Sequence, residues 1–180
     1  MQVYLIRHPE PVGTSGMCYG RTDVRVESEA VIRAWASIAA HLSAPVLVGA
    51  QVYCSPLTRC LALARQIASP REPIPADDLV EMNFGAWEAL AWDAIPRDAI
   101  DAWARDAWGY QPGGGESAAM VAIRWQRWLD RVRQGNAETV IAVTHAGVIR
   151  VALSRAAHSD HAVTIATPIP YGAVYRLDLD

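Results

Sequence analysis

The stretch Val3-Tyr4-Leu5-Ile6-Arg7-His8-Pro9-Glu10 stands at the start of the chain and decides its fold. Its leading apolar run is β-branched and aromatic enough to favour a buried strand. Pro9 ends that strand, because proline donates no hydrogen bond to a sheet ladder and keeps the preceding residue extended. Arg7 and His8 are therefore predicted at the carboxyl end of a core strand, where open α/β sheets place their ligands.

Further strands and helices alternate along the chain. Strands are predicted over about 46–53 and 139–144, and shorter ones over 79–85, 164–165 and 174–179. Helices are predicted over about 29–42, 55–68, 116–134 and 148–157, with two short helical pieces between 88 and 108. This alternation predicts an α/β fold: a three-layer α/β/α sandwich whose mainly parallel central sheet has helices on both faces.

Composition limits the classes of protein that the chain can represent. A length of 180 residues suits a single domain, residues 1–180. A hydrophobic fraction of 52% and seven tryptophans argue against disorder. A net charge of -3 gives no general attraction to nucleic acids or anionic membranes, so we expect neither as a partner.

The cellular location is inferred from what the sequence lacks. No apolar run approaches the roughly 18 residues of a membrane helix, and the N-terminus lacks the pattern of a signal peptide. Cys18, Cys54 and Cys60 are odd in number and form no CxxC pair, which favours free, packed thiols. We therefore expect a cytoplasmic protein.

Charged and imidazole side chains follow the predicted strands. His8 and His145 each end a strand, and Arg59 lies in the first turn of the helix that Ser55 is predicted to cap. Arginine offers paired donors that match a phosphoryl group, and histidine can be a neutral nucleophile in one place and a cation in another. Together with Glu81, these residues predict a pocket for a phosphoryl dianion.

At these residues the chain resembles the histidine phosphatase superfamily, whose fold is also called phosphoglycerate mutase-like. The Arg-His-Gly-Glu motif of that family appears as Arg7-His8-Pro9-Glu10, and its Ser-Pro-Leu-x-Arg element as Ser55-Pro56-Leu57-Thr58-Arg59. The acidic motif matches Glu81 to Glu88, and the late histidine matches Thr144-His145-Ala146-Gly147. The four elements occur in order over essentially the whole chain.

The resemblance implies a phosphomonoesterase that needs no metal or other cofactor. In this hypothesis neutral His8 attacks phosphorus and forms a phosphohistidine. Arg7, Arg59 and a protonated His145 hold the phosphoryl oxygens, and Glu81 protonates the leaving group and later activates water. The expected partner is a small-molecule phosphomonoester, and a homodimer is left open.

Three shorter segments resemble a narrower branch, the alpha-ribazole phosphatases, which remove the 5′-phosphate of alpha-ribazole phosphate in cobalamin nucleotide-loop assembly. The segments are Cys18-Tyr19-Gly20-Arg21-Thr22-Asp23, Trp92-Asp93-Ala94-Ile95-Pro96 and Gly113-Gly114-Gly115-Glu116-Ser117. The residues expected to bind substrate are Thr14, Tyr19, Arg21, Trp87, Glu116 and Ser117. Of these, Tyr19 or Trp87 is expected to stack on a benzimidazole-like base.

Several alternatives stay open. Pro9 and Thr14 depart from the glycine and asparagine that family members usually carry, which predicts altered phosphate geometry. Arg21 has an alternative role as a partner of Asp23, and Glu116 as a group that stabilises its own helix N-terminus. A broad-specificity sugar-phosphate or nucleotide phosphatase, a phosphoglycerate mutase and a non-catalytic phosphate-binding module are the competing functions.

Overall fold

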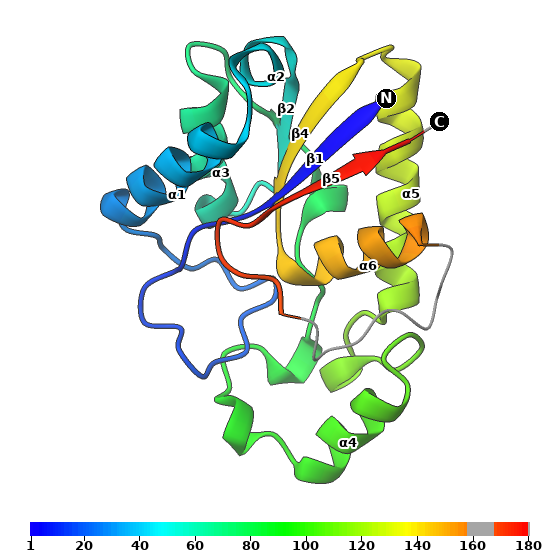
Figure 1. The fold of residues 1–180 in the computed structure, drawn as a ribbon. Helices are drawn as coiled ribbons and strands as arrows, with labels where there is room; N and C mark the ends of the chain where they lie inside the picture. The colour runs from blue at the N-terminus through cyan, green and yellow to red at the C-terminus, as the bar shows by residue number, and fades with distance from the viewer. Residues whose placement is uncertain (158–167, 180) are drawn as a thin grey trace.

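The computed structural model describes residues 1–157 and 168–179, and its centre is a five-stranded sheet (Figure 1). The strand order is β3-β2-β4-β1-β5. All neighbouring pairs are parallel except β1 and β5, which run antiparallel. The strands are β1 (Gln2–Arg7), β2 (Gln51–Cys54), β3 (Ile74–Pro75), β4 (Thr139–Thr144) and β5 (Val174–Asp178). The predicted α/β fold with a mainly parallel sheet is confirmed.

Helices cover both faces of this sheet (Figure 1). One face carries α1 (Ser28–His41), α2 (Ala44–Gly49) and α3 (Thr58–Ala68), and the other carries α5 (Ala118–Gln134) and α6 (Ala146–Ala156). Alternate residues of β1 enter the two cores, as the period of a strand requires: Val3 and Leu5 on one side, Tyr4 and Ile6 on the other. Helix α4 (Arg97–Arg105) lies away from the sheet.

The register of the central strands brings the two histidines together. Arg7 of β1 lies opposite Thr144 of β4, so His8 and His145 leave the sheet side by side. The backbone N–H of His8 donates to the carbonyl of Thr144 at 3.0 Å. Two strands that are separated by most of the chain therefore deliver their functional residues to one edge.

Three strand predictions differ from the structure. Residues 44–49 form α2, and only Gln51–Cys54 are extended, because Pro45 suits the first helical turn and a short apolar run does not separate strand from helix. Residues 79–85 form no strand: a 3-10 turn at Asp77–Leu79 leads into irregular backbone. Ile74–Pro75, predicted as loop, pairs with β2. The strand expected at 164–165 lies outside the described residues.

Helix boundaries are closer to prediction. Helix α3 begins at Thr58, three residues after Ser55, and its N-cap Leu57 has no side-chain hydrogen bond, so the predicted cap at Ser55 is wrong. Helix α6 begins at Ala146, directly after His145, which is its N-cap residue. Within the described residues, no helix is both long and apolar enough to cross a membrane. All three cysteines are buried and unpaired, as predicted.

Candidate active site

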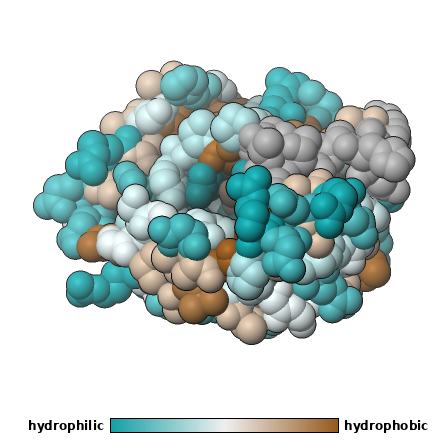
Figure 2. Space-filling view, turned by 90° about the horizontal axis from the view of Figure 1, so that it is seen from below, coloured by the Kyte–Doolittle hydropathy of each residue, from teal (hydrophilic) through white to brown (hydrophobic). Residues whose placement is uncertain are grey.

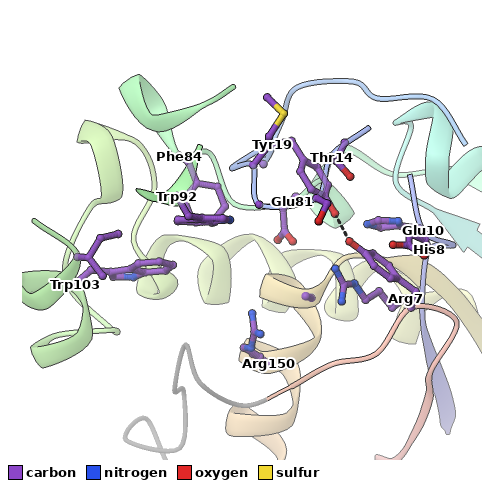
Figure 3. Close-up of a pocket in the computed structure, with 17 residues that line it drawn as sticks. Arg7, His8, Glu10, Thr14, Tyr19, Glu81, Phe84, Trp92, Trp103 and Arg150 are labelled. Atoms are coloured by element: carbon purple, nitrogen blue, oxygen red, sulfur yellow. Dashed lines mark hydrogen bonds between the residues drawn. The ribbon is translucent and has the colours of Figure 1, made fainter. Parts of the chain in front are cut away.

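A cavity of about 550 Å³ opens at the carboxyl edge of the sheet. Figure 2 views the molecule from this side and shows a face of mixed hydrophilic and hydrophobic residues with a hollow near its middle. Arg7, His8 and Glu81 line one end of the cavity, and aromatic rings line the other (Figure 3). The volume lies within the range of small-molecule sites.

The His8 ring has one defined proton position. Its Nδ1 lies 2.7 Å from the carbonyl oxygen of Pro9, and a carbonyl can only accept, so Nδ1 carries the proton and Nε2 keeps its lone pair. Burial, followed by the charges of Arg59 and Arg7, lowers the pKa of His8 well below its ordinary value. The imidazole is therefore neutral and nucleophilic at neutral pH. The proline at position 9 leaves this contact intact, because the acceptor is its carbonyl.

The His145 ring lies against His8, with ring centroids 5.1 Å apart and ring planes at 61°. Its Nε2 lies 2.8 Å from Ser55 Oγ and 3.4 Å from Cys60 Sγ. The ring is completely buried, and burial, followed by the charges of His8 and Arg59, lowers its pKa well below the ordinary value. Without a ligand the ring is therefore neutral, because burial penalises the cation. The expected protonated form concerns the pocket with a bound phosphoryl group and stays a prediction.

Two guanidinium groups approach the histidines. Arg59 is fully buried and donates to the carbonyls of Thr22 at 2.8 Å and Gly20 at 2.6 Å. Arg7 donates to the carbonyl of Ile169. Among the described residues, the buried Nε atoms of both arginines lack a hydrogen-bond partner. Buried N–H groups without an acceptor make both arginines candidates for binding an anion, which would supply the missing acceptors.

Glu81 reaches the cavity from the irregular backbone after the 3-10 turn. Its carboxylate accepts from the backbone N–H of Gly147 at 3.2 Å and of Met82 at 2.9 Å. A Cβ at position 147 would lie 2.4 Å from Glu81 Oε1, so glycine allows this approach. The carboxylate is thus held at the N-terminus of α6, where the helix dipole favours negative charge.

Two of the residues predicted to bind substrate line the cavity: Thr14 and Tyr19. Thr14 Oγ1 lies 3.5 Å from the carbonyl of Pro11. The Tyr19 hydroxyl lies 2.7 Å from the hydroxyl of Tyr171, which also lines the cavity. Thr14 and Tyr19 are thus positioned to contact a ligand.

The other residues predicted to bind substrate do not line the cavity: Arg21, Trp87, Glu116 and Ser117. Arg21 is paired with Glu116 at 3.1 Å and not with Asp23, which accepts from Thr58 instead. Glu116 also binds the buried Arg124 at 3.2 Å and accepts from the backbone N–H of Asn83. These groups are occupied in holding the chain together.

Trp87 and Ser117 also have structural positions. Trp87 is buried, with its ring 5.9 Å from that of Trp103, so its face is not available for stacking on a substrate. Ser117 accepts from the backbone N–H of Met120 at 3.3 Å and caps α5. Ser117 therefore fixes the start of α5, whereas the alternative role of Glu116 at its own helix N-terminus is not observed, since Glu116 bonds Arg21, Arg124 and the backbone of Asn83.

Sequence reasoning missed several cavity residues: Phe84, Trp92, Trp103, Arg150 and Tyr171. Tryptophan spacing alone does not separate a core residue from a pocket wall. Arg150 follows His145 by five residues on α6, so a helical projection from the strand end could have found it. No sequence signal marks Tyr171: the backbone bond from Gly172 N–H to the Arg7 carbonyl brings it to the site.

The whole chain matches a known family of proteins. A model described as the histidine phosphatase superfamily (branch 1) matches residues 3–180. The bifunctional protein Rv2228c of Mycobacterium tuberculosis is 34% identical over 146 residues, which are 79% of this chain and 35% of that protein. An uncharacterized protein of Mycobacterium bovis, Mb2253c, gives the same values. The chain thus spans about a third of the length of these curated relatives.

Solved structures show the same architecture. The protein TTHB049 from Thermus thermophilus is 27% identical, with a TM-score of 0.74, over 99% of this chain and 93% of that chain. A phosphoserine phosphatase from Entamoeba histolytica, in complex with 3-phosphoglyceric acid, has a TM-score of 0.83 and 21% identity, over 97% of this chain and 89% of that chain. At that identity the second likeness concerns the fold alone.

Proposed function

Because the chain belongs to the histidine phosphatase superfamily (branch 1), we propose that it is a phosphomonoesterase that works through a phosphohistidine on His8. The bond between His8 Nδ1 and the Pro9 carbonyl carries this proposal. It leaves the Nε2 lone pair free, and the same cavity is lined by Arg7, whose Nε has no acceptor among the described residues. A nucleophile and an anion site thus occupy one end of a cavity of small-molecule size.

In the first step, His8 Nε2 forms a bond to phosphorus as the ester P–O bond breaks. The electron pair of that bond leaves with the alcohol oxygen, and Glu81, in its carboxylic acid form, gives this oxygen a proton. Arg7 and Arg59 stabilise the charge that redistributes over the phosphoryl oxygens. The Pro9 carbonyl supports the positive charge that develops on the imidazole through its bond to Nδ1.

In the second step, water attacks the phosphohistidine, and Glu81, now a carboxylate, takes its proton. The N–P bond breaks, its electron pair returns to His8 Nε2, and inorganic phosphate leaves. His145 by itself is neutral, and a phosphoryl dianion beside it favours the protonated form, because an opposite charge raises the pKa of a histidine. The cationic role of His145 therefore begins when the substrate binds.

Hydrolysis of p-nitrophenyl phosphate without added metal, and its inhibition by vanadate, tests this function. His8→Ala should lose at least about a thousandfold in kcat, because it removes the nucleophile. The matched control is His41→Ala, which removes an exposed histidine on α1 and should retain wild-type turnover. A His8→Ala variant that retains more than a few per cent of the rate would contradict the nucleophile assignment.

We propose alpha-ribazole 5′-phosphate as the natural substrate. The proposal is supported by the motif resemblance and by the aromatic end of the cavity, where Trp92 and Trp103 are stacked with ring planes 12° apart and Phe84 meets both edge-on. Trp92 is 37% exposed although it is large and apolar. An exposed aromatic face in a cavity suits a flat base such as benzimidazole. These rings take the stacking role that was expected of Trp87.

Two substrates that differ only in the base test this specificity. Alpha-ribazole 5′-phosphate should have a kcat/KM at least about tenfold above that of ribose 5-phosphate, and Trp92→Ala should remove most of this preference. Trp108→Ala changes a tryptophan that does not line the cavity and should keep the preference. Equal activity on both substrates favours a broad-specificity phosphatase, and a preference for phosphoserine favours a small-acid phosphatase.

A further inference from the structure

Two tyrosines meet over the catalytic end of the cavity. Tyr19 belongs to the long loop after β1, and Tyr171 precedes β5. Their hydroxyl oxygens lie 2.7 Å apart, so one hydrogen bond joins the loop after β1 to the segment before β5. Both side chains line the cavity.

Each ring also lies near one of the two guanidinium groups. The Tyr171 ring centroid lies 3.8 Å from Arg7 Cζ, and the Tyr19 ring centroid lies 5.3 Å from Arg59 Cζ. Both distances fall within the range of cation–π contacts. The Tyr171 ring centroid is also 5.6 Å from that of His8. A group bound against His8 would therefore lie between the two arginines and beneath the two hydroxyls.

The pair has hydrogen-bonding capacity to spare. The bond between the two hydroxyls uses one of their two hydrogens. When ligand oxygens replace that bond, both hydrogens can be donated to the ligand. Burial, with the bond to Tyr171, raises the pKa of Tyr19, so its phenol stays protonated at neutral pH. Nearby donors are weaker than the family pattern implies: Pro9 has no N–H, and Thr14 Oγ1 faces the carbonyl of Pro11.

We propose that Tyr19 and Tyr171 form a hydroxyl clamp, which donates hydrogen bonds to the outer oxygens of the phosphoryl group held against His8. The inference rests on the proposed function, because it assigns two further binding residues to the same phosphoryl site. The Tyr171 ring makes a cation–π contact with Arg7, and the Tyr19 ring makes one with Arg59. The two hydroxyls compensate for the hydrogen-bond donors that Pro9 and Thr14 do not supply. Neither tyrosine breaks or forms a covalent bond.

Tyr19→Phe and Tyr171→Phe test the clamp, because they remove the hydroxyls and keep the rings. Each should lower kcat/KM at least about tenfold and raise the dissociation constant of inorganic phosphate by a similar factor, as the loss of a hydrogen bond to a charged group predicts. The melting temperature should stay close to that of the wild type. Tyr53→Phe is the matched control: it removes a hydroxyl that bonds Gln51, and both constants should stay within about twofold.

Measurements of turnover test the proposed phosphatase function, and measurements of phosphate binding test the tyrosine clamp. If the wild type hydrolyses no phosphomonoester, the proposed function fails, and calorimetric binding of inorganic phosphate still decides the clamp. The clamp would be overturned if both phenylalanine variants bound phosphate with dissociation constants within about twofold of the wild type. A double variant whose loss is smaller than the product of the single losses supports a paired clamp, and independent, multiplying losses would overturn the pairing.

Discussion

The two ends of the cavity are built in different ways. The catalytic end stands on regular structure: β1 and β4 end side by side, and His8 and His145 follow them directly. The aromatic end is built from residues 83–110, which contain one helix, α4, and otherwise short turns and irregular backbone. One end owes its geometry to sheet register, and the other owes it to individual side-chain contacts with the backbone.

A half-buried carboxylate organises the irregular region. Glu88 accepts from the backbone N–H groups of Arg21, Thr22 and Phe84 at 2.8–3.1 Å, and from the Thr22 hydroxyl at 2.5 Å. It thus ties the loop after β1 to the start of the aromatic end. Glycine allows equally close backbone packing: a Cβ at Gly113, whose φ is +58°, would lie 2.2 Å from the Phe84 carbonyl oxygen. Contacts of this kind leave no periodic trace in a sequence.

Glu81→Gln should have the largest effect, and it acts at the catalytic end. Removing the general acid and base should lower kcat on alkyl phosphates by about 10²–10⁴-fold. The loss in the first step should be smaller on p-nitrophenyl phosphate, because nitrophenolate leaves without a proton. Burst kinetics on both substrates measure the difference. Glu72→Gln, at an exposed residue, is the control, and an unchanged kcat on alkyl phosphates would show that Glu81 has no proton-transfer role.

Glu88→Gln should destabilise the aromatic end of the cavity. It weakens several charge-assisted hydrogen bonds at once, so the free energy of unfolding should fall by about 2–4 kcal/mol in denaturant titrations at pH 7. The preference for aromatic substrates should fall with it. If stability and specificity both match the wild type, Glu88 does not organise this region.

The same variant has a defined pH dependence. Burial opposes ionisation of Glu88, but hydrogen bonds from Thr22, Arg21 and Phe84 outweigh it and lower the pKa below its ordinary value. The carboxylate therefore stabilises the fold above the unfolded pKa of about 4.3, and this contribution is lost as the pH falls through the lower folded pKa. The stability difference between wild type and Glu88→Gln should shrink as the pH is lowered below about 4.

Gly147→Ala separates catalysis from stability. The new Cβ would displace the Glu81 carboxylate, so kcat should fall at least about tenfold. Alanine favours a helix over glycine by about 0.5–1 kcal/mol, so the melting temperature should stay level or rise. Gly49→Ala is a suitable control, because a Cβ there meets nothing within 4 Å. Full activity in Gly147→Ala would mean that the position of Glu81 is not critical.

Arg97→Ala should have the smallest effect, and it measures how much an exposed ion pair contributes to the free energy of unfolding. Arg97 and Asp101 form an ion pair of 2.8 Å on α4, and the Arg97 side chain is largely exposed. Such pairs contribute about 0.5 kcal/mol or less, so thermal unfolding should show little change. A loss comparable to that of Glu88→Gln would mean that exposed charges also hold the aromatic end together.

Prediction from the sequence succeeded at the catalytic end of the cavity and failed at the aromatic end. Sheet alternation and short motifs predicted that Arg7, His8, Arg59 and His145 lie near one another, because strand ends and helix starts have local sequence signals. Glu81 lies on irregular backbone, and only the motif resemblance predicted its place. Trp87, Arg21 and Glu116 were assigned to substrate, but Trp87 is buried, and Arg21 and Glu116 bond each other across 95 residues of sequence, which no local pattern records. The prediction of a protonated His145 did not take into account that the ring is completely buried and that burial lowers its pKa.

Phosphoryl transfer to His8 is the most direct test of the account. Rapid mixing with p-nitrophenyl phosphate, an alkaline quench that preserves phosphohistidine, and peptide mass spectrometry would locate the phosphoryl group. The account predicts one phosphoryl group per chain, on His8, that accumulates in Glu81→Gln and is absent from His8→Ala. A wild-type enzyme that turns over substrate with no phosphorylated residue, or with the label on another side chain, would contradict it.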